Sequence, residues 1–124
     1  MNKAIVAKNA PAAVGPYVHA VQAGNLIFVS GQLGLNPTTG ELADGLVAQT
    51  EQALENLKAV LNEAGYELSD VVKTTVFIDD MNNFGKVNEI YAKHFGESKP
   101  ARSCVEVSKL PKGGLVEIEC MAAK

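Results

Sequence analysis

The pattern of apolar and polar positions along the chain predicts six strands and two long helices. Apolar side chains spaced three or four residues apart indicate helices, whereas β-branched and aromatic runs indicate strands. The helical spacing covers two stretches, marked by Val47, Thr50, Leu54, Leu57 and Leu61, and by Phe84, Val87, Tyr91 and Phe95. The strands are expected over residues 3–7, 17–23, 26–30, 71–78, 101–107 and 115–122.

Turn and cap residues support these boundaries. Gly24 and Asn25 form a two-residue hairpin turn signal between two expected strands. Asp44 is a plausible N-cap for the first helix, and Gly65 stands where a C-terminal cap glycine belongs. Asn82 or Asn83 is expected to cap the second helix. Residues 31–45 read as a loop between these elements.

The order of the elements predicts an α+β two-layer domain over residues 1–124, with one mixed sheet and two helices on one face. Residues 26–29 are apolar without alternation, as expected for a strand covered on both faces. The two helices can cover only one face. Oligomerisation would supply the second cover, and a site could form at the seam.

Composition narrows the class of protein. A chain of 124 residues with a net charge of −3 is not expected to carry a broad nucleic-acid surface. No apolar run reaches the roughly 20 residues of a membrane span, and the amino terminus lacks a signal-peptide core, which predicts a cytoplasmic protein. We expect Cys104 and Cys120 to be free thiols. His19 and His94 lie in no metal-binding spacing, so no metal site is expected.

Two charges on the last expected strands are the strongest chemical signal. Arg102 is a fixed cation whose planar fork matches a carboxylate or a phosphate in two parallel hydrogen bonds. Glu117, between Val116 and Ile118, is the natural candidate to handle a proton or a water molecule. An anion anchor and a carboxylate on neighbouring strands indicate a small-molecule site for an anionic substrate.

Other interpretations of these residues stay open at this point. Arg102 could be a structural ion-pair residue, Glu117 and Glu119 could form a solvated sheet edge, and Cys104 could be a small core residue. If Val107 opposes Leu115 in a simple hairpin, Arg102 and Glu117 point to opposite faces. A bulge or a one-residue shift reverses that, and the two could also meet across a subunit boundary.

Ordered motifs along nearly the whole chain resemble the Rid family, the reactive intermediate deaminases, also called the YjgF family. The most specific are PARSCV at 100–105 and LPKGGLVEIE at 110–119. Supporting motifs are APAAVGPY at 10–17, FVSGQ at 28–32, TGE at 39–41 and VNEIY at 87–91. The chain departs from the usual family pattern at Val18-His19, where Ser-Gln is common, and at His94, where an aromatic is common.

The resemblance implies a chorismate-mutase-like α+β fold and a homotrimer with sites between subunits. It implies hydrolysis of 2-iminobutanoate and 2-iminopropanoate, which arise from pyridoxal-phosphate dehydratases, to 2-keto acids and ammonia. Such an enzyme serves in metabolite damage control and needs no cofactor. Carried over by position, Arg102 grips the substrate carboxylate, and Glu117 positions or activates water with help from the Cys104 backbone carbonyl. The expected pocket-lining residues are Tyr17, Ser30, Gly31 and Asn88.

Two functions of other classes remain as alternatives. Some family members have been described as ribonucleases or translation inhibitors, and others as chaperone-like. The acidity of this chain and its lack of a basic, aromatic surface weaken the ribonuclease interpretation. A non-catalytic regulatory protein that binds keto acids would keep Arg102 and could dispense with Glu117, so the presence of Glu117 favours the enzyme.

Overall fold

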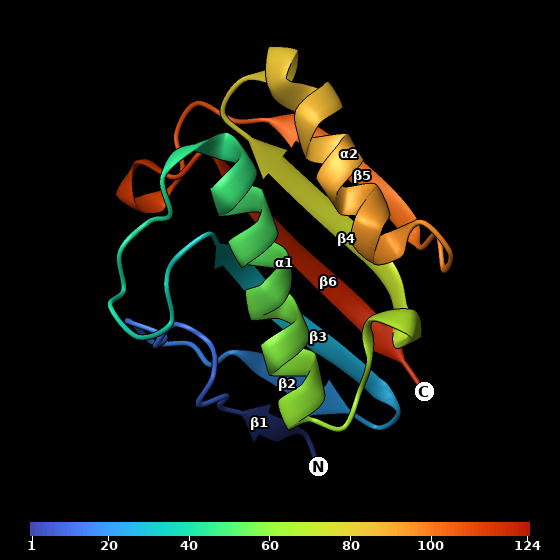
Figure 1. Ribbon diagram of the computed structural model, residues 1–124. Coiled ribbons are helices and arrows are strands. Elements are labelled where there is room, and N and C mark those ends of the chain that lie inside the picture. Colours follow the sequence, from blue (N-terminus) through green and yellow to red (C-terminus); the bar gives the residue numbers. More distant parts are fainter.

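The computed structural model describes all 124 residues as one six-stranded sheet with two helices packed on the same face (Figure 1). The strand order is β1-β2-β3-β6-β4-β5, and only the β4–β5 pair is parallel. The strands are β1 Lys3–Ile5, β2 Ala20–Ala23, β3 Leu26–Leu33, β4 Val71–Ile78, β5 Ala101–Glu106 and β6 Val116–Ala123. The helices are α1 Gly45–Glu63 and α2 Phe84–Phe95. This confirms the predicted α+β two-layer architecture.

Helix α1 buries most of its predicted stripe. Thr50, Leu54, Leu57 and Leu61 are fully buried, whereas Val47 at the start of the stripe is 51% exposed. Gly65 ends the helix with φ +80, and its N–H donates to the Asn62 carbonyl. Together with the bond from the Tyr66 N–H to the Leu61 carbonyl, this is the Schellman arrangement that a cap glycine permits. Asp44 occupies the N-cap position without a side-chain capping bond.

Helix α2 begins differently from the prediction. Asn83 stands at its N-cap but makes no side-chain capping bond. A short 3-10 turn, Met81–Asn83, precedes the helix, and there the Asp80 carboxylate accepts from the Asn82 N–H at 2.9 Å. The capping bond therefore comes from an aspartate one turn earlier, because the 3-10 turn moves the first free N–H groups toward Asp80.

The core lies between the helices and one face of the sheet. Its fully buried side chains come from all the central elements and include Leu57, Val76, Phe95 and Ile118. None of the helices combines the length and the apolar character that crossing a membrane requires.

The boundaries of two strands differ from the predictions by three residues, and β1 ends at Ile5 rather than at residue 7. Strand β2 begins at Ala20 rather than at residue 17, so Tyr17 lies in the preceding loop. Strand β3 continues to Leu33, although residues 31–45 were expected to be a loop. Its pairing with β6 is interrupted between Val29 and Gln32. Such a bulge breaks the alternation of side chains between the two faces of the strand. The sequence pattern at the end of β3 therefore predicts a loop.

Strands β5 and β6 are not neighbours, which corrects the expectation for the two charged strands. Strand β4 lies between them, so Arg102 aligns with Thr74, and Thr74 aligns with Cys120. The β4-α2-β5 unit is a parallel crossover, and β6 pairs with the other side of β4. A simple hairpin between the last two strands is therefore wrong.

The sheet face opposite the helices is open and partly apolar. Phe28 is 43% exposed there, Met121 38% and Val105 43%. Strand β6 lies in the middle of the sheet, so the interpretation of Glu117 as a solvated edge residue is also wrong. The predicted need for a second cover applies to this face.

Candidate active site

The predicted site residues fall into two groups on different sides of the sheet. Arg102 shares its register position with Thr74, whose hydroxyl contacts Tyr91 of α2, so the Arg102 side chain lies on the helix side. Glu117 alternates with the buried Val116 and Ile118 and therefore points to the open face. Within one chain these two residues do not meet.

The arginine half-site consists of Arg102, Asn88 and Cys104. One terminal nitrogen of the Arg102 guanidinium donates to the Asn88 side-chain oxygen at 2.7 Å. None of the ion pairs in the structure involves Arg102, which is the only arginine of the chain. Its remaining donors stay free to hold a carboxylate in two parallel hydrogen bonds. Asn88 lies in the middle of α2, and this contact gives its side-chain amide a polar partner.

The Cys104 thiol and the Cys104 backbone carbonyl lie in different surroundings. The Val107 N–H donates to the Ile78 carbonyl at 2.8 Å, so the backbone N–H and carbonyl of Val107 point toward β4. Because backbone groups alternate sides along a strand, the carbonyl of Cys104 points to the free edge of the sheet, as does that of Arg102. The thiol packs against the core, and burial raises its pKa, with the Arg102 charge acting weakly in the other direction. A protonated thiol is a poor nucleophile.

We therefore expect Cys104→Ala to keep the activity of the protein within about threefold, because the substitution leaves the backbone carbonyl in place and a partly buried Cys behaves as a small apolar residue. The measurement is kcat and KM of the purified variant, with circular dichroism to establish folding. Complete inactivation of a folded variant would instead identify the thiol as a nucleophile.

The glutamate half-site consists of Glu117, Gly31 and Tyr17, which line one cavity of about 390 Å³. A Cβ atom on Gly31 would lie 2.9 Å from the carboxyl carbon of Glu117, so the missing side chain makes room for the carboxylate. Burial raises the pKa of Glu117, and the neighbouring Glu119 charge raises it further. A carboxylate with a raised pKa is a better proton acceptor near neutral pH.

Gly31→Ala tests this close approach. The added methyl group must displace the Glu117 carboxylate, and misplacement of a reacting group by about 1 Å can cost up to about 100-fold in rate. We expect a folded protein with kcat reduced about 10- to 100-fold. Gly85→Ala in α2 is the matched control, because its Cβ would meet open space. Equal turnover in both variants would show that Gly31 does not set the carboxylate position.

Ser30 holds the loop that carries Tyr17. The Ser30 hydroxyl donates to the Val18 carbonyl at 2.7 Å, and its N–H donates to the His19 carbonyl at 2.9 Å. Tyr17 itself is 53% exposed and lies at the mouth of the cavity. It was expected to begin a strand, but the turn at Gly15, with φ +132, keeps it outside the sheet.

His19, where the chain departs from the usual family pattern, lines the same cavity but has both ring nitrogens occupied. Nδ1 accepts from the Ala7 N–H at 2.8 Å, and Nε2 lies 2.7 Å from the Pro11 carbonyl. The neutral tautomer with a proton on Nε2 satisfies both contacts. Through these two contacts, His19 connects the amino-terminal segment to the wall of the cavity. His94, the other departure, lies near Glu51 of α1 at 3.7 Å and outside the site.

The sequence did not point to every residue around the two half-sites. Pro111 and Lys112 line the cavity beside Glu117, and Lys112 has φ +59, which is uncommon for a residue with a side chain. Tyr91 and Phe84 were assigned to the apolar stripe of α2, yet their rings lie against Arg102. Tyr91 lies three residues and Phe84 four residues from Asn88, and this spacing could have indicated the cluster, because such residues share a helix face.

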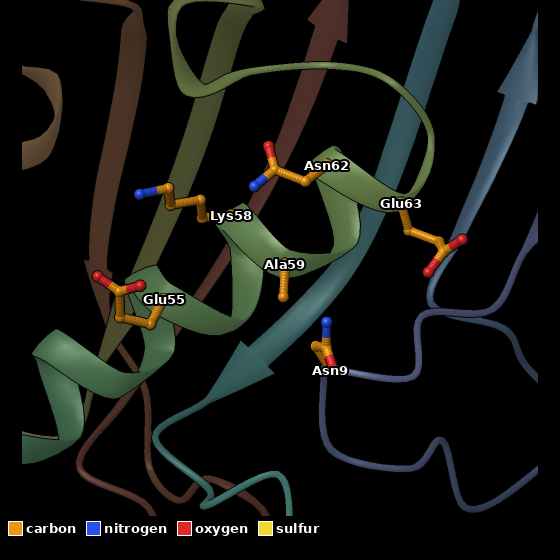
Figure 2. Close-up of a pocket in the computed structure, with 6 residues that line it drawn as sticks. All are labelled: Asn9, Glu55, Lys58, Ala59, Asn62 and Glu63. Atoms are coloured by element: carbon orange, nitrogen blue, oxygen red, sulfur yellow. The ribbon is translucent and has the colours of Figure 1, made fainter.

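Another pocket, of about 400 Å³, lies on the outward side of α1 (Figure 2). It is mostly polar and open. Its lining residues are Asn9, Glu55, Lys58, Ala59, Asn62 and Glu63. None of the predicted site residues lies there.

Comparison with known proteins identifies relatives of this chain. A family model described as endoribonuclease L-PSP matches residues 7–124. A RutC family protein of Pyrococcus horikoshii is 54% identical, covering all of this chain and 99% of that protein. The Escherichia coli protein named 2-iminobutanoate/2-iminopropanoate deaminase is 50% identical, with 100% and 99% covered. The crystal structure of E. coli TdcF with bound serine has a TM-score of 0.94 at 43% identity, covering 98% of each chain.

The chain therefore belongs to the endoribonuclease L-PSP family, also known as the YjgF or Rid family. Names within this family differ, from RutC family protein to deaminase to endoribonuclease. Family membership alone thus leaves the reaction to be argued from the site.

Proposed function

We propose that this protein is a 2-iminobutanoate/2-iminopropanoate deaminase, and that its sites form between the subunits of a homotrimer. The observation that carries the proposal is the free guanidinium of Arg102, which Asn88 orients and no carboxylate of the chain neutralises. A 2-imino acid offers the carboxylate that fits this anchor. Its imine carbon is the electrophile that a water molecule activated by Glu117 can attack.

The reaction needs only proton transfers. The water oxygen bonds to the carbon of the protonated imine while Glu117 takes one water proton, which gives a neutral amino alcohol. Glu117 then returns the proton to the amine nitrogen, and the C–N bond breaks as the hydroxyl oxygen forms the carbonyl bond. The hydroxyl proton leaves to solvent or to ammonia, so the products are the 2-keto acid and ammonium. The Cys104 carbonyl, at the free edge of β5, is a suitable acceptor for a water or amine proton.

The positions of Arg102 and Glu117 on the two faces of the sheet support an intersubunit site. Arg102 lies at the β5 edge on the helix side, whereas Glu117 lies on the open face of the same chain. A second copy whose β5 edge meets this open face would bring the two half-sites together and cover Phe28 and Met121. Such a contact joins different surfaces of the two copies, and it closes into a ring when the rotation permits.

The assay mixes the protein with a dehydratase that produces 2-iminobutanoate and follows the imine by semicarbazide trapping. We expect the protein to reduce trapping in proportion to its concentration and to release 2-oxobutanoate. Unchanged trapping at stoichiometric protein would contradict the proposal. An RNA-cleavage assay on the same preparation tests the endoribonuclease alternative, for which a net charge of −3 and one arginine give little phosphate affinity.

The assembly can be measured directly. Sedimentation equilibrium at micromolar concentration is expected to give three times the chain mass of 13.1 kDa. Phe28→Glu should lower this mass, because it places a charge on the open face. Val47→Glu is the matched control, since Val47 is a similarly exposed apolar residue on α1. A monomer in the wild-type protein would overturn the intersubunit site.

A further inference from the structure

The guanidinium of Arg102 lies against an aromatic surface on α2. Its central carbon is 4.7 Å from the centroid of the Tyr91 ring and 5.3 Å from that of Phe84. Asn88, which accepts from the same guanidinium, stands between them on the helix. Residues at these steps of four and three share one helix face, so the two rings and the amide contact one side chain together.

Contacts with Thr74 and Phe95 hold the Tyr91 side chain in place. Its hydroxyl lies 2.7 Å from the Thr74 hydroxyl, and both residues are buried, at 7% and 0% exposure. Its ring packs against Phe95 at a centroid distance of 4.8 Å. Thr74 is also the register partner of Arg102 across β4 and β5. Thr74 therefore lies beside Arg102 in the sheet and also contacts the ring that lies against the Arg102 guanidinium.

We propose that Tyr91, held by Thr74, is a positioning residue that sets the plane of the Arg102 guanidinium for the substrate carboxylate. This inference rests on the proposed function, in which Arg102 binds that carboxylate. Two parallel hydrogen bonds require the guanidinium and the carboxylate to be coplanar. Asn88 restrains one nitrogen only, whereas the Tyr91 ring, 4.7 Å from the central carbon, restricts the space in which the whole group can rotate. Ordering this long side chain before binding removes part of its entropic cost.

Nuclear magnetic resonance tests the contact without any activity. Arg102 is the only arginine, so the chain gives a single arginine Nε–Hε correlation. A proton near the face of an aromatic ring is shifted upfield by the ring current. We expect this shift in the wild-type protein and in Tyr91→Phe, which keeps the ring. In Tyr91→Leu the signal should move toward the position of a free arginine. An unmoved signal in a folded Tyr91→Leu protein would overturn the proposal.

Binding and kinetics supply the second readout. Calorimetric titration with 2-oxobutanoate should show a Kd raised about 3- to 30-fold in Tyr91→Leu, the range that a cation–π contact supports. Imine turnover should show a similar rise in KM with a smaller change in kcat, because the loss acts on carboxylate binding. Tyr91→Phe and Thr74→Val should stay within about threefold, since a single neutral hydrogen bond contributes little.

Tyr66→Leu is the matched control. Its ring is equally buried and also faces a cation, with the Lys124 ammonium 5.7 Å from the centroid, but its hydroxyl bonds to Asn25. Equal effects of Tyr66→Leu and Tyr91→Leu on the Kd would reduce Tyr91 to a general structural role and overturn the proposal. If Tyr91→Leu does not fold, Phe84→Leu takes its place, because Phe84 is only partly buried. A Kd and an arginine signal both unchanged in that variant would count against positioning by the rings.

The deaminase function and the positioning role of Tyr91 can be contradicted separately. A wild-type protein that binds 2-oxobutanoate but does not hydrolyse imines would overturn the deaminase function, and the ring-dependent Kd would still support positioning of Arg102. A wild-type protein that hydrolyses imines, with the same Kd and KM in folded Tyr91→Leu, would keep the function and overturn the role of Tyr91.

Discussion

Glu117→Gln is expected to lower kcat about 10²- to 10⁴-fold, the contribution that a positioned acid or base typically makes. Gln nearly matches Glu in volume, so the packing around Gly31 should change little. It keeps one acceptor oxygen but cannot take a proton from water at neutral pH. The affinity for 2-oxobutanoate should persist, because the carboxylate anchor Arg102 is unchanged. The measurements are imine turnover and calorimetric titration of the same protein.

The pH dependence gives this prediction a second signature. Glu117 must be ionised to accept a proton, and burial together with the Glu119 charge raises its pKa. The rate should therefore fall as the pH decreases through that raised pKa, which lies above the ordinary value for a glutamate. Glu119→Gln is the matched control on the same strand face. It should keep turnover and shift the acid limb to lower pH, because it removes one of the charges that raise the pKa of Glu117.

Loss of carboxylate binding together with turnover in Glu117→Gln would mean that the substitution disturbs the whole pocket. Unchanged turnover would remove Glu117 from the mechanism and leave Arg102 as an anchor without a named partner. A wild-type protein that binds 2-oxobutanoate but shows no turnover to lose would indicate a regulatory protein instead of an enzyme.

Arg102→Lys has the second largest expected effect. Lys keeps the charge but not the planar fork, and it cannot hold both the Asn88 oxygen and a carboxylate in the same plane. Hydrogen bonds to charged groups contribute about 1.5–3 kcal/mol, so kcat/KM should fall about 10- to 150-fold while the protein stays folded. The Kd for 2-oxobutanoate should rise by a similar factor.

Arg102→Met provides the comparison without charge. It should lose more affinity than Arg102→Lys, because it removes the electrostatic attraction as well as the geometry. Wild-type efficiency in Arg102→Lys would remove the anchoring role. Equal losses in the two variants would show that charge alone contributes nothing at this position.

The helices and the order of elements could be predicted because each depends on local spacing. The stripe from Leu54 to Leu61 and the cap glycine at Gly65 both act within a few residues of one another. The end of β3 could not be predicted, because the bulge between Val29 and Gln32 breaks the alternation on which the prediction rests.

The sequence pattern could not predict which strands lie beside β5, for a different reason. Periodicity indicates which face of a strand is buried, but not which strand lies beside it. Strand β4 between β5 and β6 therefore contradicted the expected neighbours, although the side chains of Arg102 and Glu117 were identified correctly as charges on strands. The cluster of Tyr91, Asn88 and Arg102 also depends on long-range packing of α2 on β5.

We propose that Arg102 of one subunit and Glu117 of another form one site, and mixed assemblies test this directly. Two inactive variants, Arg102→Lys and Glu117→Gln, can be co-expressed with different affinity tags and purified as mixed assemblies. Some sites in a mixed trimer then contain both native residues. One site of the three in each mixed trimer is native, so the purified mixed assemblies should recover about a third of the wild-type turnover per site. Turnover in the mixed assemblies no higher than that of the two parent variants would contradict the intersubunit site.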